Sequence, residues 1–197
     1  IYDGLEDFNI AAVAFQKELV SDLSNPVAIL MLGNIYLKQK SFKEAIDLYN
    51  KVLMLQPLNK EAHLNIGVAY HHLKEYEKAE VYYKKAIELD PKSFMAYFDL
   101  GYLYENINED NEAIAFYKKA IAVKPDYYIA YYNIGNIWLT KFKNVQRAEE
   151  AYRKALEIEP NHADSAMNLS MLLFYQKKFE EADAFCKKAQ SLGLTPP

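Results

Sequence analysis

The chain has 197 residues, of which 51% are hydrophobic and 25% are charged, a composition typical of a folded protein and not of a disordered one. Its formal net charge is only -4, and Lys and Glu are interleaved along it, so we expect no nucleic-acid partner. No apolar run reaches the roughly 18 residues of a membrane span, and the single Cys186 excludes both an internal disulfide and a four-cysteine zinc site.

From residue 26 onward the chain repeats itself at an interval of 34 residues. Glycines recur at Gly33, Gly67, Gly101 and Gly135, and the same interval separates Ala45, Ala79 and Ala113, and Pro57, Pro91 and Pro125. A fixed period of about 20 to 50 residues indicates stacked supersecondary units.

The first 25 residues are less regular but keep the same register. Ala11 lies 34 residues before Ala45, and Phe15 lies 34 residues before Tyr49. We therefore expect residues 1–25 to form a leading helix, either the second helix of a truncated repeat or a cap. Neither end of the chain carries an obviously polar capping helix. The simplest expectation is a piece of a longer protein, and the rival expectation is stacking of the exposed ends on another copy.

Each later period is predicted to form a helix, a short polar turn and a second helix, because apolar residues recur twice at helical spacing. In the second period the helices run near Glu61–Leu73 and Glu77–Leu89, and Pro91 ends the second one because proline lacks a backbone donor. The five predicted repeats span residues 26–59, 60–93, 94–127, 128–162 and 163–197. The fourth repeat has one extra residue near Lys143, where a turn absorbs it at little cost.

The residue types at fixed positions resemble the tetratricopeptide repeat. One repeat carries Asn65-Ile66-Gly67, Tyr70, Ala79, Tyr83, Ala86 and Pro91, and the next carries Asp99-Leu100-Gly101, Tyr104, Ala113, Tyr117, Ala120 and Pro125. The resemblance covers residues 26–194, and the fifth repeat departs from it at Ser170, Cys186 and Leu194. It implies an all-α fold, an α-solenoid in which antiparallel helix pairs form a right-handed superhelix.

Small and aromatic residues have separate expected roles in this packing. Gly33 and its equivalents are expected where the two helices of a repeat cross, and Ala45 and its equivalents are expected to face the next repeat. The aromatic residues three positions after each glycine are expected to fill the space between helices: Tyr36, Tyr70, Tyr104 and Trp138.

A second series lies two residues before each glycine. It consists of Asn65, Asp99, Asn133 and Asn168, with Met31 as the exception. Two residues correspond to about 200° around a helix, so this position points away from the core. In the tetratricopeptide family this helix lines the concave groove, and the series resembles the asparagine ladder of the O-linked N-acetylglucosamine transferase arm. There the amides hold the backbone of an extended peptide, since each offers a donor and an acceptor.

Apolar side chains accompany this series, as expected for a surface that a partner covers. The predicted peptide-binding groove comprises Asn34, Asn65, Asp99, Asn133, Asn136, Asn168, Leu64, Val68, Phe98, Tyr102 and Tyr132. Its expected ligand is an extended or helical segment of another protein with apolar or aromatic side chains. The alternative is that the asparagines are solvated or bridge neighbouring helices.

One ligand class of the family is not expected. Co-chaperones that hold the acidic C-termini of chaperones combine two asparagines, at the positions of Asn34 and Asn65, with Lys and Arg. Here Leu30, Met95 and Asp99 stand where those cations are needed. A terminal carboxylate would therefore lack its charge-assisted hydrogen bonds.

No pattern of catalytic or metal-binding residues is present in the sequence. It has no Gly-rich phosphate loop and no nucleophile elbow, and adjacent His71 and His72 point about 100° apart on a helix. The predicted function is therefore a non-catalytic protein-binding scaffold without metal or cofactor. Two alternatives stay open, namely the substrate-recognition arm of a larger enzyme such as a glycosyltransferase, and a self-assembling structural scaffold.

Overall fold

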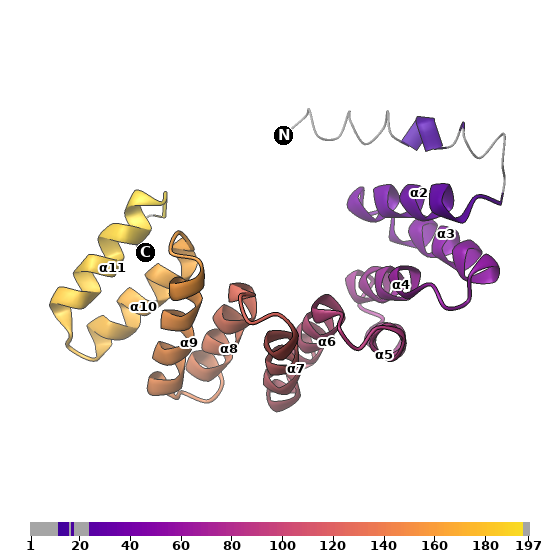
Figure 1. Ribbon diagram of the computed structural model, residues 1–197. Coiled ribbons are helices and arrows are strands. Elements are labelled where there is room, and N and C mark those ends of the chain that lie inside the picture. The colour runs from indigo at the N-terminus through magenta and orange to yellow at the C-terminus, as the bar shows by residue number, and fades with distance from the viewer. Residues whose placement is uncertain (1–11, 16, 18–23, 195–197) are drawn as a thin grey trace. The chain divides into compact units, whose positions relative to one another are not determined.

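The computed structural model describes residues 12–15, 17 and 24–194, and every regular element within them is a helix (Figure 1). The chain divides into two compact bodies, an N-terminal body (Ile1–Leu103) and a C-terminal body (Tyr104–Pro197). The first contains α2 (Pro26–Lys38), α3 (Phe42–Leu55), α4 (Lys60–His72), α5 (Tyr76–Leu89) and most of α6 (Phe94–Asn106). The second contains the end of α6 and α7 (Asp110–Val123), α8 (Tyr128–Thr140), α9 (Val145–Ile158), α10 (Ala163–Tyr175) and α11 (Phe179–Ser191). The expected all-α fold is confirmed.

The helices pack in sequential pairs, and within each body one pair packs on the next. The closest packing is between α2 and α3, α4 and α5, α8 and α9, and α10 and α11. Within the N-terminal body α3 also packs on α4, and within the C-terminal body α7 packs on α8 and α9 on α10. We call α2, α4, α6, α8 and α10 the first helices, and α3, α5, α7, α9 and α11 the second helices.

A left-handed residue closes the turn inside every pair. Positive φ angles between 55° and 64° occur at Lys40, Lys74, Asn108, Lys143 and Lys177. This backbone conformation reverses the chain in a few residues but is unfavourable for a side chain with a Cβ atom. The extra residue of the fourth repeat lies in this turn, which runs from Lys141 to Asn144 and leaves both flanking helices at their usual lengths.

The core of each pair is built around one tyrosine of the second helix. Tyr49, Tyr83, Tyr117 and Tyr152 are 0–1% exposed. Three of these rings lie directly against a glycine of the first helix. A Cβ atom on that glycine would lie 2.6 Å from the ring in each pair: Gly33 with Tyr49, Gly67 with Tyr83, and Gly135 with Tyr152. Glycine is therefore required at these helix crossings by the adjacent ring.

The aromatics expected between the helices pack at the edge of this core. Tyr36, Tyr70, Tyr104 and Trp138 are only partly buried. Tyr70 stacks on Tyr82 with 5.7 Å between ring centroids, and Tyr104 stacks on Phe116 at 5.3 Å. These aromatics therefore pack between helices as expected, but they are less buried than the core tyrosines, because helical spacing identifies an apolar face and not how deeply each side chain is buried.

The last pair departs from this arrangement. Ser170 replaces the glycine and donates a hydrogen bond to the carbonyl of Ala182 at 2.7 Å, while Cys186 stands where the other pairs have tyrosine. Without the ring, an open cavity of about 500 Å³ lies between α10 and α11. Its walls include Met171, Phe174 and Phe179, which are 37%, 60% and 56% exposed.

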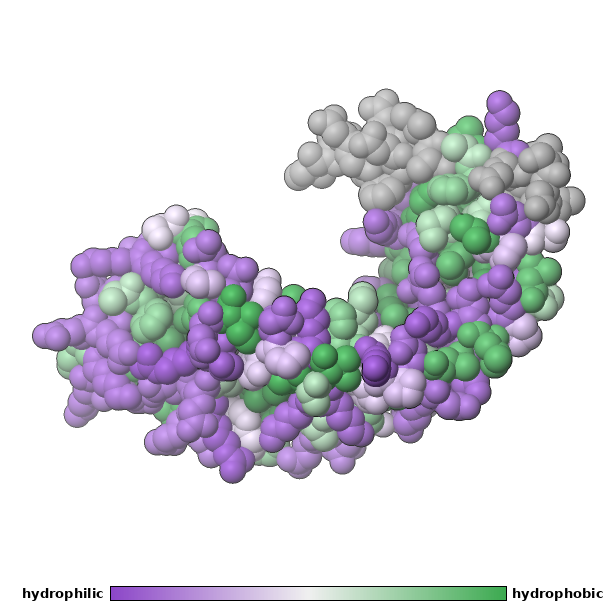
Figure 2. Space-filling view, viewed as in Figure 1, coloured by the Kyte–Doolittle hydropathy of each residue, from purple (hydrophilic) through white to green (hydrophobic). Residues whose placement is uncertain are grey.

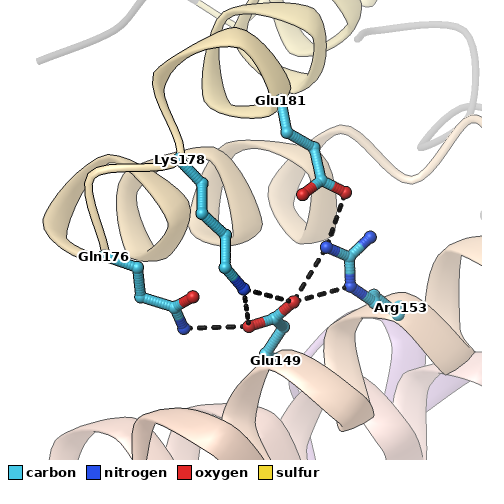
Figure 3. Close-up of polar contacts among 5 residues, drawn as sticks. All are labelled: Glu149, Arg153, Gln176, Lys178 and Glu181. Carbon is cyan, nitrogen blue, oxygen red and sulfur yellow. Dashed lines mark hydrogen bonds and ion pairs between the residues drawn. The ribbon is translucent and has the colours of Figure 1, made fainter.

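A polar network joins α9 to the final pair (Figure 3). The Glu149 carboxylate accepts hydrogen bonds from Arg153 at 2.9 Å, Gln176 at 2.8 Å and Lys178 at 3.2 Å. Arg153 also donates to Glu181 at 2.6 Å. Partial burial alone would raise the pKa of Glu149, but these three hydrogen bonds hold it below its ordinary value.

Part of the predicted leading helix is described. Residues 12–15 and 17 are helical, Ala12 is buried against Leu32 and Ile35 of α2, and Phe15 packs beside them. The leading helix was predicted within residues 1–25. Of this segment, residues 1–11, 16 and 18–23 lie outside the described part of the chain.

The outer surface is mixed in character. Figure 2 shows hydrophilic residues interspersed with smaller hydrophobic areas on the visible face. The second helices carry many of the charges, as ion pairs one turn apart such as Lys84 with Glu80 at 2.6 Å and Lys154 with Glu157 at 2.9 Å. Across the described segments, no helix combines the length and apolar character that a membrane crossing requires.

Candidate functional site

The predicted groove residues all lie on first helices, and none of them is fully buried. Asn34 lies on α2; Leu64, Asn65 and Val68 lie on α4; Phe98, Asp99 and Tyr102 lie on α6; Tyr132, Asn133 and Asn136 lie on α8; and Asn168 lies on α10. Tyr102 is 46% exposed and the others are partly exposed. We call Asn65, Asp99, Asn133 and Asn168 the ladder positions.

In the N-terminal body, the amides bind the hydroxyl of a core tyrosine. The Tyr49 hydroxyl donates to Oδ1 of Asn34 at 2.8 Å, and Nδ2 of Asn65 donates to the same oxygen at 2.8 Å. Nδ2 of Asn34 in turn donates to Glu61 at 3.1 Å. Asn34 therefore joins α2, α3 and α4 and uses both ends of its amide inside the protein.

The same arrangement recurs in the C-terminal body. The Tyr152 hydroxyl donates to Oδ1 of Asn136 at 2.8 Å, and Nδ2 of Asn168 donates to that oxygen at 3.1 Å. Nδ2 of Asn133 donates to the Tyr117 hydroxyl at 3.2 Å. Each asparagine at a ladder position thus contacts the polar end of a tyrosine from the preceding pair, directly or through one amide.

These contacts satisfy polar groups that would otherwise be stranded in the core. Burial raises the pKa of Tyr49 and of Tyr152 well above the ordinary phenol value, so both hydroxyls remain protonated donors at neutral pH. A buried donor without an acceptor costs about 1–3 kcal/mol. Asn34 and Asn136 supply the acceptors, so part of the asparagine pattern serves the fold.

The side-chain oxygen, Oδ1, of each asparagine at a ladder position accepts no hydrogen bond within the described part of the protein. Among the described residues, no N–H or O–H group donates to Oδ1 of Asn65, Asn133 or Asn168. An amide oxygen can accept two hydrogen bonds, and these three side chains are partly exposed. They can therefore accept backbone N–H groups from a bound segment without losing their internal contacts.

Asp99 is the exception in this series. In the described part of the chain it takes part in no hydrogen bond or ion pair, and its desolvation raises its pKa to about 7. Its carboxylate lies near the Tyr83 hydroxyl and contributes, after burial, to the raised pKa of that tyrosine. The Tyr83 hydroxyl contacts Nδ1 of His71 at 3.3 Å.

His71 does not neutralise Asp99. Burial, with a smaller contribution from the neighbouring His72, lowers the pKa of His71 to about 4, so its ring is uncharged at neutral pH. The ring packs tilted against that of Tyr102 with 5.2 Å between centroids.

The first helices also expose apolar side chains beside the ladder positions. Met95 and Tyr102 of α6 are 52% and 46% exposed, and Met171 of α10 is 37% exposed. Leu64, Val68, Phe98 and Tyr132 are partly exposed. The first helices thus expose apolar side chains in addition to those that they bury.

The internal hydrogen-bond partners of the amides were not among the residues predicted from the sequence. Glu61, Glu105 and His71 bind the network, and Tyr117 donates to Glu105 at 2.6 Å. A signal was available, because His71 and Glu105 both lie four residues after a glycine and one turn from the tyrosine-facing surface. No cluster of potential metal ligands is found among the residues that the structure describes.

Sequence profiles of known families match most of the chain. A profile described as "Tetratricopeptide repeat" matches residues 61–93, and one described as "TPR repeat" matches residues 33–74. The profile of the "Cilia and flagella-associated protein 70 middle TPR-like domain" matches residues 97–195, about half of the chain. A search of curated protein sequences finds no match.

Solved structures with the same architecture are numerous. The crystal structure of MamA is similar with 30% identity and a TM-score of 0.71, covering 82% of this chain and 94% of MamA. PilF of Pseudomonas aeruginosa has 22% identity and a TM-score of 0.79, covering 86% of this chain and 77% of PilF. YrrB, described as "a TPR protein with an unusual peptide-binding site", has 20% identity and a TM-score of 0.67, covering 92% of this chain and 93% of YrrB.

Proposed function

Because the chain belongs to the tetratricopeptide repeat family, whose members serve as protein-interaction modules, we propose that it is a non-catalytic scaffold that binds a peptide segment of another protein. Within each body, the segment lies against the outer faces of the first helices. It has an extended or helical backbone and apolar or aromatic side chains.

One observation carries this proposal: at Asn65, Asn133 and Asn168 an amide is held by the protein at one end and free at the other. Nδ2 of each makes an internal hydrogen bond of 2.8–3.2 Å, which fixes the side chain before a ligand arrives. Oδ1 stays available. A fixed acceptor loses little conformational entropy on binding, which favours recognition of a peptide backbone.

The neighbouring apolar side chains supply most of the affinity. Each backbone hydrogen bond contributes only about 0.5–1.5 kcal/mol net. Burying the exposed parts of Met95, Tyr102 and Met171 yields roughly 25 cal/mol per Å² of apolar area. The amides therefore set the register of the segment and its direction more than its strength of binding.

A peptide-array screen of the intact chain tests the proposal. The test variant replaces Asn65, Asn133 and Asn168 with Ala, and the matched control replaces Asn50, Asn111 and Asn161, none of which is part of a first helix. We expect peptides with apolar side chains to bind the wild type and the control and to lose binding to the test variant. Equal binding by all three proteins would refute the role of the ladder positions.

A second variant guards against loss of folding in the first. Met95→Ser changes an exposed side chain outside the tyrosine–asparagine network. It should weaken peptide binding without lowering the melting temperature. Unchanged affinity in this variant would contradict the proposed surface.

Self-assembly is a second candidate function, favoured by the last helix pair. Met171, Phe174, Tyr175 and Phe179 are exposed around the cavity between α10 and α11, and Tyr175 is 84% exposed. Light scattering over a concentration series tests whether the protein self-associates. A molar mass that grows with protein concentration, and that is lower for Phe174→Ser, supports association of copies. A strictly monomeric mass removes this candidate.

A further inference from the structure

Asp99 occupies a position where the other repeats from the second onward have asparagine. Asn65, Asn133 and Asn168 each donate Nδ2 to an internal acceptor, which a carboxylate cannot do. Among the described residues, the hydroxyl of the preceding core tyrosine, Tyr83, makes no hydrogen bond to Asp99. It contacts Nδ1 of His71 instead. Asp99 therefore places on the proposed peptide-binding face a carboxyl group that has no cationic partner among the described residues.

Other carboxylates near a first helix have partners. Glu61 accepts from Asn34 at 3.1 Å, and Glu105 accepts from the Tyr117 hydroxyl at 2.6 Å. Asp99 alone among these three lacks a donor in the described part of the chain. The Tyr83 hydroxyl interacts electrostatically with it, and the His71 ring that contacts this hydroxyl is uncharged at neutral pH. A partly desolvated anion of this kind gains strongly from a cation that reaches it.

The side chains around Asp99 form a surface suited to one kind of group. Met95 lies four residues before Asp99 and Tyr102 three residues after it, so both are its neighbours on the outer face of α6. Both are about half exposed, at 52% and 46%. An apolar side chain and an aromatic ring thus flank a single carboxylate.

We propose that Asp99 is a specificity-determining residue that selects peptides with a Lys or Arg side chain at the position opposite α6. This inference rests on the proposed peptide-binding function and adds the charge of the ligand. The aliphatic stem of the basic residue packs along Met95, and its cationic group lies between the Asp99 carboxylate and the Tyr102 ring. The choice of a basic ligand also agrees with the absence of Lys and Arg at the positions of Leu30 and Met95, which excludes an acidic terminus.

The test compares three intact proteins on one positional peptide library. The proteins are the wild type, Asp99→Asn, which restores the residue of the other repeats, and Asp126→Asn, which removes the same charge from an exposed turn. The library is built on apolar peptides that bind the wild type. Each position is occupied in turn by Lys, Arg, Gln or Glu.

We expect the wild type to prefer Lys or Arg over Gln at one position by about tenfold or more, as a charge-assisted hydrogen bond provides. Asp126→Asn should keep that preference, and Asp99→Asn should lose it while still binding the Gln peptide. The preference should also weaken as salt is added. Asp99→Asn copies a residue that the fold already accepts at three equivalent positions, so a melting curve at least as high as that of the wild type is expected.

Two results overturn the inference in distinguishable ways. If the wild type binds apolar peptides but the preference for a basic residue is absent, or persists in Asp99→Asn, the inference fails and the proposed function stands. If no peptide binds the wild type, both fail.

Discussion

Gly67 shows how a single residue type can be dictated by its neighbour. It lies inside α4, where alanine would ordinarily be more favourable by about 0.5–1 kcal/mol. Here a Cβ would lie 2.6 Å from Cδ1 of Tyr83, whose side chain is 1% exposed. We expect Gly67→Ala to lower the free energy of unfolding by about 1–3 kcal/mol, measured by urea denaturation.

The last helix pair suggests the control for this prediction. Ser170 is tolerated there because Cys186 replaces the ring. In a Tyr83→Cys background, Gly67→Ala should therefore cost much less than in the wild type. An equal cost in both backgrounds would contradict the proposed contact.

Asp99 makes stability depend on pH. Its pKa in the folded protein is about 7, against an ordinary value of 3.8, so the folded state binds its proton more tightly than the unfolded state. Ionisation of Asp99 then opposes folding: its contribution is most favourable below about pH 4 and is lost as the pH rises through 7.

Asp99→Asn should remove this dependence. At about pH 8 we expect the variant to exceed the wild type in free energy of unfolding by about 1–3 kcal/mol, a discounted figure because the side chain is partly exposed. At about pH 4 the two proteins should be nearly equal. His71 titrates in both and cancels in the difference. Denaturation at several pH values measures this, and a difference that does not change with pH would refute it.

Among the elements, the turn inside each pair carries a recognisable strain. Four of the five left-handed positions are lysines, and only Asn108 is a residue type that tolerates this conformation well. We expect Lys74→Asn to raise the free energy of unfolding by up to about 1 kcal/mol. Lys118→Asn, on the exposed face of α7, should not be stabilising. Thermal melting compares them, and a loss of stability in Lys74→Asn would count against the strain.

The junction between α9 and the last pair is held by charge (Figure 3). The pKa of Glu149 is lowered, so its stabilisation is present above the ordinary carboxyl pKa and disappears as the pH falls through the lowered value. We expect Glu149→Gln to cost about 1–2 kcal/mol at neutral pH and to speed hydrogen exchange of α10 and α11.

Glu157→Gln is the matched control for this junction. Glu157 pairs only with Lys154 on the surface of α9, at 2.9 Å, and such pairs contribute about 0.5 kcal/mol or less. Equal effects of the two substitutions would show that the network adds nothing to a surface ion pair.

The sequence was sufficient to predict the helix pairs but not their polar contacts. Apolar periodicity and Pro91 placed the second helix of the second repeat at Glu77–Leu89, and the structure has it at Tyr76–Leu89. The bond from Asn65 to Asn34 joins residues 31 apart, and its existence depends on where the Tyr49 hydroxyl emerges from the core. Periodicity gives the direction of a side chain, whereas hydrogen-bond partners depend on how far each side chain reaches.

At the scale of the whole molecule, repeated residues and variable residues have different roles. The glycines and core tyrosines recur because the first four pairs have a tyrosine ring at the same place in the core. At the ladder positions, Nδ2 of each asparagine supports the fold, and Oδ1 accepts no hydrogen bond from the described residues. Where the series is broken, at Asp99 in the third repeat and at Cys186 in the fifth, the molecule gains an acidic ladder position and a cavity between α10 and α11.

The most direct measurement of the central claim is an NMR titration that follows the side-chain amides of asparagine while a peptide selected by the array is added. We expect saturable shifts for Asn65, Asn133 and Asn168, because the carbonyl of each accepts a backbone N–H of the peptide. The resonances of Asn111 and Asn161, which are not part of a first helix, should not shift. Saturation of the peptide with unchanged ladder amides, or shifts confined to the second helices, would contradict it.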